Sequence, residues 1–223
     1  MNCTRRHFIA GMGASLLVTG TSHRVLAADA KIDGVRYAMV HDETLCIGCN
    51  ACEDACRVVN HVPEGVSRLT IVRTGPVGDY PDVKYHFFRH SCQHCDNPPC
   101  VSVCPTGASY REPLTGIVDV HRDKCVGCQY CVAACPYRVR FIHPINKTPD
   151  KCNFCRDTNL AEGKLPACVL ACPTKALTFG NLDDPHSEVN QLLEVKPTYR
   201  TKVALGTEPK VYRVPFQRRE IKR

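Results

Sequence analysis

Repeated cysteine spacings constrain the fold of this chain more than any other feature of its sequence. The chain has 17 cysteines among 223 residues, and sixteen of them form four quartets. Every quartet opens with two cysteines separated by two residues and closes with two separated by three, while the central spacing varies. The quartets are Cys46, Cys49, Cys52 and Cys56; Cys92, Cys95, Cys100 and Cys104; Cys125, Cys128, Cys131 and Cys135; and Cys152, Cys155, Cys168 and Cys172.

The spacing of the quartets suits iron–sulfur clusters. Three cysteines in the order C-x2-C-x2-C lie on one tight loop that can hold three corners of a cubane cluster. Small residues such as Gly48, Ala51 and Gly127 allow backbone N–H groups to point at the sulfurs. We expect the fourth cysteine at the start of the following helix, where it ligates a second cluster, as in two-cluster ferredoxins.

Three other uses of cysteine compete with this interpretation. A disulfide framework suits an exported chain with an even number of cysteines, but it does not call for four repeats of one spacing. The last quartet, with twelve residues between its pairs, would by itself pass for a zinc site. A c-type haem needs C-x2-C-H, whereas the residues after the four C-x2-C pairs are Asn50, Asp96, Gln129 and Arg156.

Composition makes a bound metal useful to the fold. The chain has no tryptophan and a modest number of large apolar residues. Such a chain has difficulty burying a large core, so metals or disulfides are expected to help it fold.

Short strands are predicted next to the quartets, with the clusters serving as the core. Quartets two and three form one half of the molecule, and quartets one and four close the other half around it. We therefore predict an α+β fold, a tandem ferredoxin-like arrangement of two pseudo-symmetric two-cluster halves with little regular secondary structure. Residues 60–82, which contain several Gly and Pro, are predicted to be an inserted surface loop. The predicted strands are residues 36–41, 84–89, 108–111, 117–121, 139–143 and 176–179.

The N-terminus is predicted to be an export signal. TRRHFI at residues 4–9 resembles the twin-arginine motif, and a weakly apolar run and small residues follow it. Residues 1–27 are therefore predicted to be a twin-arginine signal peptide, which exports a folded protein with its cofactor inserted. We expect a periplasmic protein at the outer face of the inner membrane. Later residues contain no run of the roughly 18 apolar residues that a membrane span needs.

Net charge does not indicate nucleic-acid binding. The formal charge of +7 falls to +4 when the signal, with three arginines and no acidic residue, is removed. Each oxidised cubane with four thiolates adds about −2, so four clusters bring the total to roughly −4. A basic stripe with interleaved aromatic residues, as nucleic-acid binding requires, is not legible.

The motifs resemble the four-cluster ferredoxin subunits of the dimethylsulfoxide-reductase and polysulfide-reductase type. CIGCNACEDACRVVN at residues 46–60 is similar to that family's first quartet, including Arg57 where a proline would follow the fourth cysteine. CQHCDNPPCVSVCPTGA, CVGCQYCVAACPYRVRF and KCNFCRDTNLAEGKLPACVLACPTKAL are similar to the other three. The resemblance covers residues 36–183. It implies ferredoxin-type units at 36–66, 83–114 and 115–145 and a fourth quartet at 148–183. Residues 184–223 are predicted to be a basic C-terminal tail.

The resemblance also implies which cysteines hold which cluster. No cysteine position of the family is missing here, so four [4Fe–4S] clusters are implied. The implied ligand sets are Cys46, Cys49, Cys52 and Cys172; Cys152, Cys155, Cys168 and Cys56; Cys92, Cys95, Cys100 and Cys135; and Cys125, Cys128, Cys131 and Cys104.

A relay of electrons is the function that these clusters imply. A cluster with four cysteine ligands has no open position for substrate, so no catalytic residue is predicted and the chain is not expected to be an enzyme by itself. His94, between Cys92 and Cys95, is interpreted as an exposed side chain or as a tuning residue of its cluster. A relay needs a partner at each end, and the resemblance implies an integral-membrane quinol dehydrogenase subunit on one side.

The partner on the other side separates the functional hypotheses. The export signal and the lack of a membrane anchor make the chain most similar to the iron–sulfur proteins of formate-dependent nitrite reduction, whose acceptors are periplasmic c-type cytochromes. The alternative is a subunit of a molybdopterin oxidoreductase that acts on polysulfide, tetrathionate or formate. A third hypothesis is a metal- or disulfide-stapled binding protein without a redox role.

The basic C-terminal segment has two interpretations. Residues 194–223 contain nine basic and three acidic residues. They dock on the partner or on lipid head groups, or they form a solvated tail held by apolar contacts of Val211, Tyr212, Val214 and Phe216.

Overall fold

The structure is a computed structural model, and it describes residues 34–216. The predicted signal peptide, residues 1–27, and the last seven residues of the basic tail lie outside the described residues. The strands are β1 (Tyr37–Asp42), β2 (Leu69–Val77), β3 (Lys84–Ser91), β4 (Ser109–Arg111), β5 (Val118–Val120), β6 (Phe141–Ile142), β7 (Pro149–Asp150), β8 (Leu177–Asn181) and β9 (Val211–Val214). The helices are α1 (Ala51–Val59), α2 (Pro99–Ser102), α3 (Tyr130–Ala133), α4 (Ala167–Leu170), α5 (Glu188–Val195) and the 3-10 turns η1 (Asn159–Glu162) and η2 (Val203–Leu205).

A three-stranded sheet in the order β8-β1-β9 joins the beginning and the end of the described chain. Strand β1, before the first quartet, pairs antiparallel with β8, after the fourth quartet. Side chains alternate along β1, as a strand requires. Ala38 and Val40 pack with Val189 of α5, and Met39 packs among buried cysteines. Both faces of this strand are therefore covered, and quartets one and four are held near each other.

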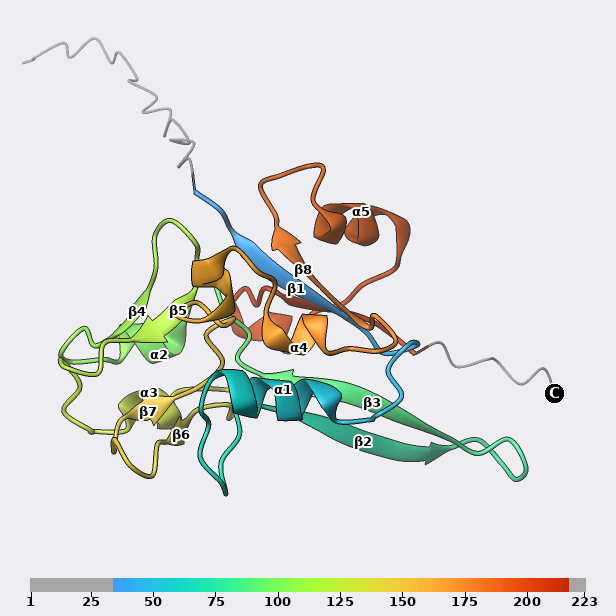
Figure 1. Cartoon of the computed structure of the whole chain (residues 1–223), viewed down its shortest axis with the longest axis horizontal. Coiled ribbons are helices and arrows are strands. Elements are labelled where there is room, and N and C mark those ends of the chain that lie inside the picture. Colours follow the sequence, from blue (N-terminus) through green and yellow to red (C-terminus); the bar gives the residue numbers. More distant parts are fainter. Residues whose placement is uncertain (1–33, 217–223) are drawn as a thin grey trace, which may run out of the picture. The chain divides into compact units, whose positions relative to one another are not determined.

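The longest strand lies where the sequence predicted a surface loop. Residues 69–77 form β2, which pairs antiparallel with β3 from Leu69 opposite Ser91 onward. The prediction gave weight to Gly and Pro in this segment, but these residues lie where the ladder becomes irregular, between Thr74 and Val77. The run of β-branched residues before them carries the pairing. Figure 1 shows the resulting two-stranded ribbon.

Two short hairpins connect the remaining quartets. Strands β4 and β5 pair between quartets two and three, close to the predicted ranges. Strands β6 and β7 pair between quartets three and four. The strand predicted over residues 139–143 is shorter than expected, because only Phe141–Ile142 has a partner. The predictions for residues 36–41, 84–89 and 176–179 correspond to β1, β3 and β8.

One helix in each quartet carries the third cysteine. Helices α2, α3 and α4 are single turns that contain Cys100, Cys131 and Cys168. The fourth cysteine of these quartets follows the helix instead of starting it, so that part of the prediction was wrong. In quartet one, the longer helix α1 contains both Cys52 and Cys56. Helices α1 and α4 lie side by side (Figure 1), which brings Cys56 and Cys168 to the same region.

The C-terminal segment is part of the sheet. Strand β9 pairs in parallel with β1, and Val211 and Val214 are buried. The apolar contacts expected of a pinned tail are therefore present at these two residues, but they belong to a strand. Arg213 of β9 also forms a bridge with Tyr199.

Cysteines make up much of the core. The largest cluster of buried residues contains Met39, Leu69, Phe154 and Phe179 together with seven cysteines. These elements are short and mixed, as the α+β prediction requires, while the pseudo-symmetry of the two halves stays a prediction. None of the helices within residues 34–216 has the length and apolar character to cross a bilayer.

Candidate metal centres

Four hollows within residues 34–216 are each lined by four cysteines. They have about 330, 220, 320 and 310 Å³ of unfilled space, in the order A to D. Site A is lined by Cys46, Cys49, Cys52 and Cys172; site B by Cys56, Cys152, Cys155 and Cys168; site C by Cys92, Cys95, Cys100 and Cys135; and site D by Cys104, Cys125, Cys128 and Cys131.

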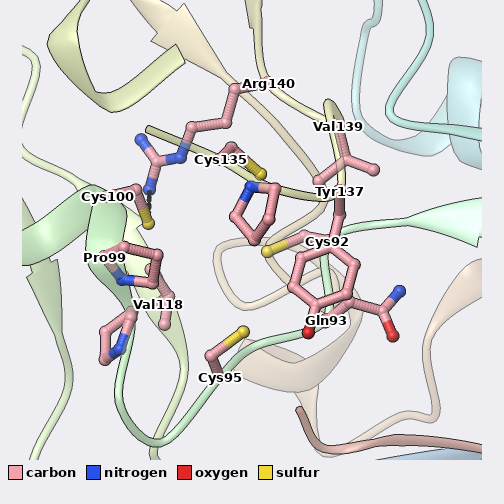
Figure 2. A pocket seen from close by; sticks show the side chains of 12 residues that line it. Cys92, Gln93, Cys95, Pro99, Cys100, Val118, Cys135, Tyr137, Val139 and Arg140 are labelled. Carbon is pink, nitrogen blue, oxygen red and sulfur yellow. Dashed lines mark hydrogen bonds between the residues drawn. The ribbon is translucent and has the colours of Figure 1, made fainter. Parts of the chain in front are cut away.

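Each hollow combines three cysteines of one quartet with one cysteine of another. Figure 2 shows this for site C, where the sulfurs of Cys92, Cys95 and Cys100 meet that of Cys135 from the next quartet. Because the helix between the third and fourth cysteines directs the fourth away from its own loop, that cysteine reaches the neighbouring hollow. The four sets of cysteines are the same sets that the family resemblance implies as ligands.

A left-handed residue before the second cysteine shapes all four loops. The φ angles are 70° at Gly48, 45° at His94, 72° at Gly127 and 56° at Phe154. Glycine adopts this conformation without steric cost, whereas His94 and Phe154 need support from their surroundings. Their rings provide it, since they stack with centroids 3.7 Å apart. This stack connects the loop of site C to the loop of site B.

His94 is fully buried, so its interpretation as an exposed side chain was wrong. Its Nδ1 accepts a hydrogen bond from the Val118 N–H at 3.2 Å. Burial, and then the positive charges of Lys151 and Lys210, lower the pKa of His94 well below its usual value. His94 is therefore neutral at physiological pH and fills the space between two hollows.

Hydrogen-bond donors point at several of the sulfurs. The Ser109 N–H donates to Cys104 Sγ at 3.3 Å, and the Ala176 N–H donates to Cys172 Sγ at 3.2 Å. Asn60 Nδ2 donates to Cys155 Sγ at 3.3 Å. Such donors stabilise thiolates, so the sulfurs are prepared to carry negative charge.

Two buried arginines also approach the sulfurs. Arg89 Nη2 lies 3.6 Å from Cys152 Sγ, and Arg140 Nη2 lies 3.2 Å from Cys100 Sγ, as Figure 2 shows for site C. Burial acts to lower the pKa of Arg89, but the charges of the neighbouring cysteines outweigh it and raise that pKa overall. Sequence reasoning missed both arginines, because the cysteine spacing assigns no role to Arg89, which precedes the second quartet, or to Arg140, which lies near the end of the third motif.

Burial raises the pKa of several thiols, which therefore stay protonated when no cation compensates them. It raises the pKa of Cys52 and Cys92 to about 11 and that of Cys95 and Cys168 to about 12. Cys104 differs: burial acts to raise its pKa, but the hydrogen bonds from Ser109 and Thr106 together outweigh burial and lower that pKa overall. Binding of a positively charged metal centre would displace these protons, since the thiolate is the ligand.

The hollows fit a [4Fe–4S] cluster. Each offers four sulfur donors around a space of several atoms, with N–H donors directed at the sulfurs. The sixteen cysteines of residues 34–216 are free thiols. Within the same residues, no group of three or more His, Cys, Asp or Glu side chains is arranged to hold a single metal ion. Four cysteine sulfurs around one hollow are the donor set of a [4Fe–4S] cluster.

Sequence comparisons define the same class of protein. A family model described as a 4Fe-4S dicluster domain matches residues 83–182, and a second model with that description matches residues 45–108. The chain thus consists largely of two 4Fe-4S dicluster regions in tandem.

Individual relatives narrow this class. The chain is 70% identical over 221 residues to Protein NrfC of Escherichia coli (strain K12), covering 99% of both proteins. It is 55% identical over 185 residues to the B subunit of polysulfide reductase from Wolinella succinogenes, a match that covers 82% of this chain and 96% of that protein. The thiosulfate reductase electron transfer subunit PhsB of Salmonella typhi is 51% identical over 179 residues, 80% of this chain and 92% of that protein. The chain belongs to the NrfC family of iron–sulfur electron-transfer subunits, which confirms the resemblance predicted from the cysteine motifs.

Proposed function

We propose that this protein relays electrons in the periplasm from a membrane quinol-oxidising partner to c-type cytochromes during anaerobic nitrite respiration. Sites A to D would each hold one [4Fe–4S] cluster through the four cysteines that line it. Such clusters supply one-electron transfer. Full-length similarity to Protein NrfC supports the assignment to this branch of the family.

The exposure of the four sites is the observation that carries the proposal. All eight cysteines of sites B and C are buried. Site A includes the exposed Cys49, and site D includes the exposed Cys128. Two surface sites with two buried sites between them suit a relay that accepts electrons at one end and releases them at the other.

Contacts between the hollows support the order A–B–C–D. As thiolates, Cys52 of site A and Cys56 of site B would both interact with Arg89. The stack of His94 and Phe154 connects sites B and C. In the same way, Cys100 of site C and Cys131 of site D both act on Arg140. Each neighbouring pair therefore shares one buried side chain or one stacked pair.

Both outer sites have exposed apolar side chains beside them. Ile47, between Cys46 and Cys49, is 60% exposed, and Val126, between Cys125 and Cys128, is 69% exposed. Tyr130, near site D, is also exposed. Exposed apolar side chains in such positions are typical of docking surfaces for protein partners. We therefore assign one partner to each end, and the twin-arginine motif supports a periplasmic location.

The first test is the cofactor content of the mature protein purified without oxygen. We expect roughly sixteen irons and roughly sixteen acid-labile sulfides per chain, with coupled electron paramagnetic resonance signals on reduction. Zinc in place of iron, or the absence of labile sulfide, would overturn the electron-transfer function.

A second test separates the two ends. We expect Ile47→Asp and Val126→Asp to retain full iron, because both side chains are exposed. One variant should slow reduction by quinol-containing membranes, and the other should slow oxidation by a c-type cytochrome. Equal rates for both variants and the unaltered protein would exclude these surfaces as docking sites.

A second candidate function follows from the other relatives. Two of them are named for polysulfide reductase and thiosulfate reductase. The same relay would then deliver electrons to a molybdopterin oxidoreductase. Stopped-flow reoxidation of the reduced protein distinguishes the two functions, because the correct acceptor, a c-type cytochrome or a molybdopterin subunit, should react at least about tenfold faster.

A further inference from the structure

Buried cations divide into two kinds in this protein. Within residues 34–216, six Arg or Lys side chains are buried: Arg68, Arg89, Arg140, Lys151, Lys210 and Arg213. Four of these form ion pairs with carboxylates, namely Arg68 with Asp150, Lys151 with Asp119, Lys210 with Asp96 and Arg213 with Glu43. Arg89 and Arg140 have no carboxylate partner among the described residues.

Arg89 is the more deeply buried of the two unpaired cations. Its side chain is fully buried, and its Nη1 contacts the sulfur of Met39 while its Nη2 points to Cys152 Sγ. Its Nε has no hydrogen-bond partner. The cysteines that act on it most strongly when they are thiolates are Cys168, Cys152 and Cys56 of site B and Cys52 of site A.

Arg140 has equivalent surroundings in the other pair of sites. Its Nη2 donates to Cys100 Sγ and, at 2.9 Å, to Ser109 Oγ, while its Nη1 has no partner. The cysteines that act on it most strongly when they are thiolates are Cys100, Cys92 and Cys135 of site C and Cys131 of site D. Each arginine is thus surrounded by three cysteines of one buried site, B or C, and by one cysteine of an outer site, A or D.

A buried guanidinium without a counter-ion is strongly destabilising, because it loses its hydration and gains no attraction in return. Neutral thiols do not supply the missing negative charge. A [4Fe–4S] cluster with four thiolates does, since its net charge is about −2 when oxidised and one unit more negative when reduced. The two orphaned arginines therefore match the charge that loaded sites would carry.

We propose that Arg89 and Arg140 are the internal counter-charges of the relay, Arg89 for sites A and B and Arg140 for sites C and D. Each guanidinium stabilises the added electron and raises the reduction potential of the pair of clusters beside it. The effect is larger at inner sites B and C, whose cysteines provide three of the four sulfurs around each arginine. This inference rests on the proposed electron-transfer function, and both arginines act as positioning charges that undergo no chemistry themselves.

The test uses the loaded protein and two matched variants, Arg89→Met and Arg140→Met. Methionine retains much of the volume of arginine and removes the charge. Potentiometric titration followed by electron paramagnetic resonance measures the four reduction steps. We expect each variant to shift two steps to lower potential, and a different two in each variant. Arg36→Met removes an exposed arginine that pairs with Asp183, and should leave all four steps unchanged.

Conservative variants separate charge from packing. Arg89→Lys and Arg140→Lys keep the positive charge and should retain most of the original potentials. If a methionine variant fails to hold the iron of its two sites while the lysine variant holds it, a counter-charge role is still required. Equal loss of iron in the lysine and methionine variants would overturn the proposal. The shape of the arginine side chain, and not its charge, would then decide whether the sites hold iron.

Two results would overturn the inference without touching the proposed function. One is full iron content with unchanged potentials in both methionine variants. The other is an identical shift of the same steps in both variants, which would mean that the arginines do not serve separate pairs. Absence of iron from the unaltered protein would instead overturn the proposed function itself.

Discussion

The two outer sites and the two inner sites use the same donor set in different surroundings. Sites A and D lie in loops with exposed cysteines and exposed apolar neighbours. At sites B and C every cysteine is buried, and the His94–Phe154 stack connects their loops. Four sulfurs in a hollow are thus compatible with either a surface contact or a core.

This difference in burial distinguishes the structural role of a site from its role in electron exchange with partners. Inner cysteines replace the large apolar side chains that a core of this size otherwise needs. The outer sites include the exposed Cys49 and Cys128, so a partner could approach a cluster that these sites would hold. Changes at inner sites should therefore affect folding, and changes at outer sites should affect partners or only local stability.

Removal of all iron is expected to have the largest effect. The buried cysteines would become neutral thiols around empty space, and Arg89 and Arg140 would lose their counter-charge. We expect the metal-free protein to lose its cooperative thermal unfolding transition, since binding energy of structural metals is folding energy. Circular dichroism of the protein before and after oxidation and chelation measures this. A metal-free protein with an unchanged transition would show that the fold does not depend on the clusters.

Single cysteine replacements compare an inner site with an outer site directly. Cys168→Ser in site B should remove the iron of both B and A, about eight ions per chain, because the two sites share Arg89 and the α1–α4 contact. Cys49→Ser in site A should remove at most about four ions. Iron analysis of the purified variants measures both. Equal losses would contradict the distinction between inner and outer sites.

The two outer loops also differ from each other at their glycines. A Cβ atom at Gly48 would collide with the ring of Phe87, whereas the nearest atom to a Cβ at Gly127 is the Lys147 carbonyl oxygen at 3.9 Å. Both glycines have positive φ, so Gly127→Ala should destabilise the protein by about 1–2 kcal/mol. Gly48→Ala should destabilise the protein by about 1–3 kcal/mol more, because the ring of Phe87 must also be displaced. Thermal unfolding of both variants tests this, and a smaller effect at Gly48 would refute it.

Acid should weaken the protein through a histidine at site A. Burial, and then the positive charges of Arg89 and Arg213, lower the pKa of His41 from 6.5 to about 3. Because His41 does not bind a proton in the folded state until pH falls toward 3, its contribution to the free energy of unfolding is complete above pH 6.5. This contribution is lost as pH falls toward 3. Between neutral pH and pH 5 the loss should be about 2 kcal/mol. Denaturant unfolding midpoints at the two pH values measure it.

The matched control for this prediction is His41→Asn. The Arg89 N–H lies 3.4 Å from His41 Nδ1, and an asparagine oxygen can accept the same hydrogen bond without titrating. This variant should lose about 2 kcal/mol of the pH dependence and retain the part that comes from His94. Site A differs in this respect from site D, because the described residues that line site D include no histidine. An unchanged pH dependence in His41→Asn would exclude His41 as its source.

The kind of cofactor could be predicted from local spacing. A C-x2-C-x2-C loop has only a few backbone conformations, so Cys46 to Cys52 and Cys125 to Cys131 indicate their chemistry without any tertiary information. The strands next to the quartets were also predictable, because short alternating runs precede or follow the cysteine loops. Pairing of the quartets came from the family resemblance, and the hollows bring the same cysteines together.

Long-range contacts decided what the spacing could not. Strand β2 exists because β3 offers it a partner, in spite of the Gly and Pro that suggested a loop. Strand β9 turns part of a basic tail into an edge of the sheet. Arg89 lies 63 residues from Cys152, and Arg140 lies 40 residues from Cys100. Burial and electrostatic attraction depend on distance in space, so only the folded chain shows which sites are inner and which cations they face.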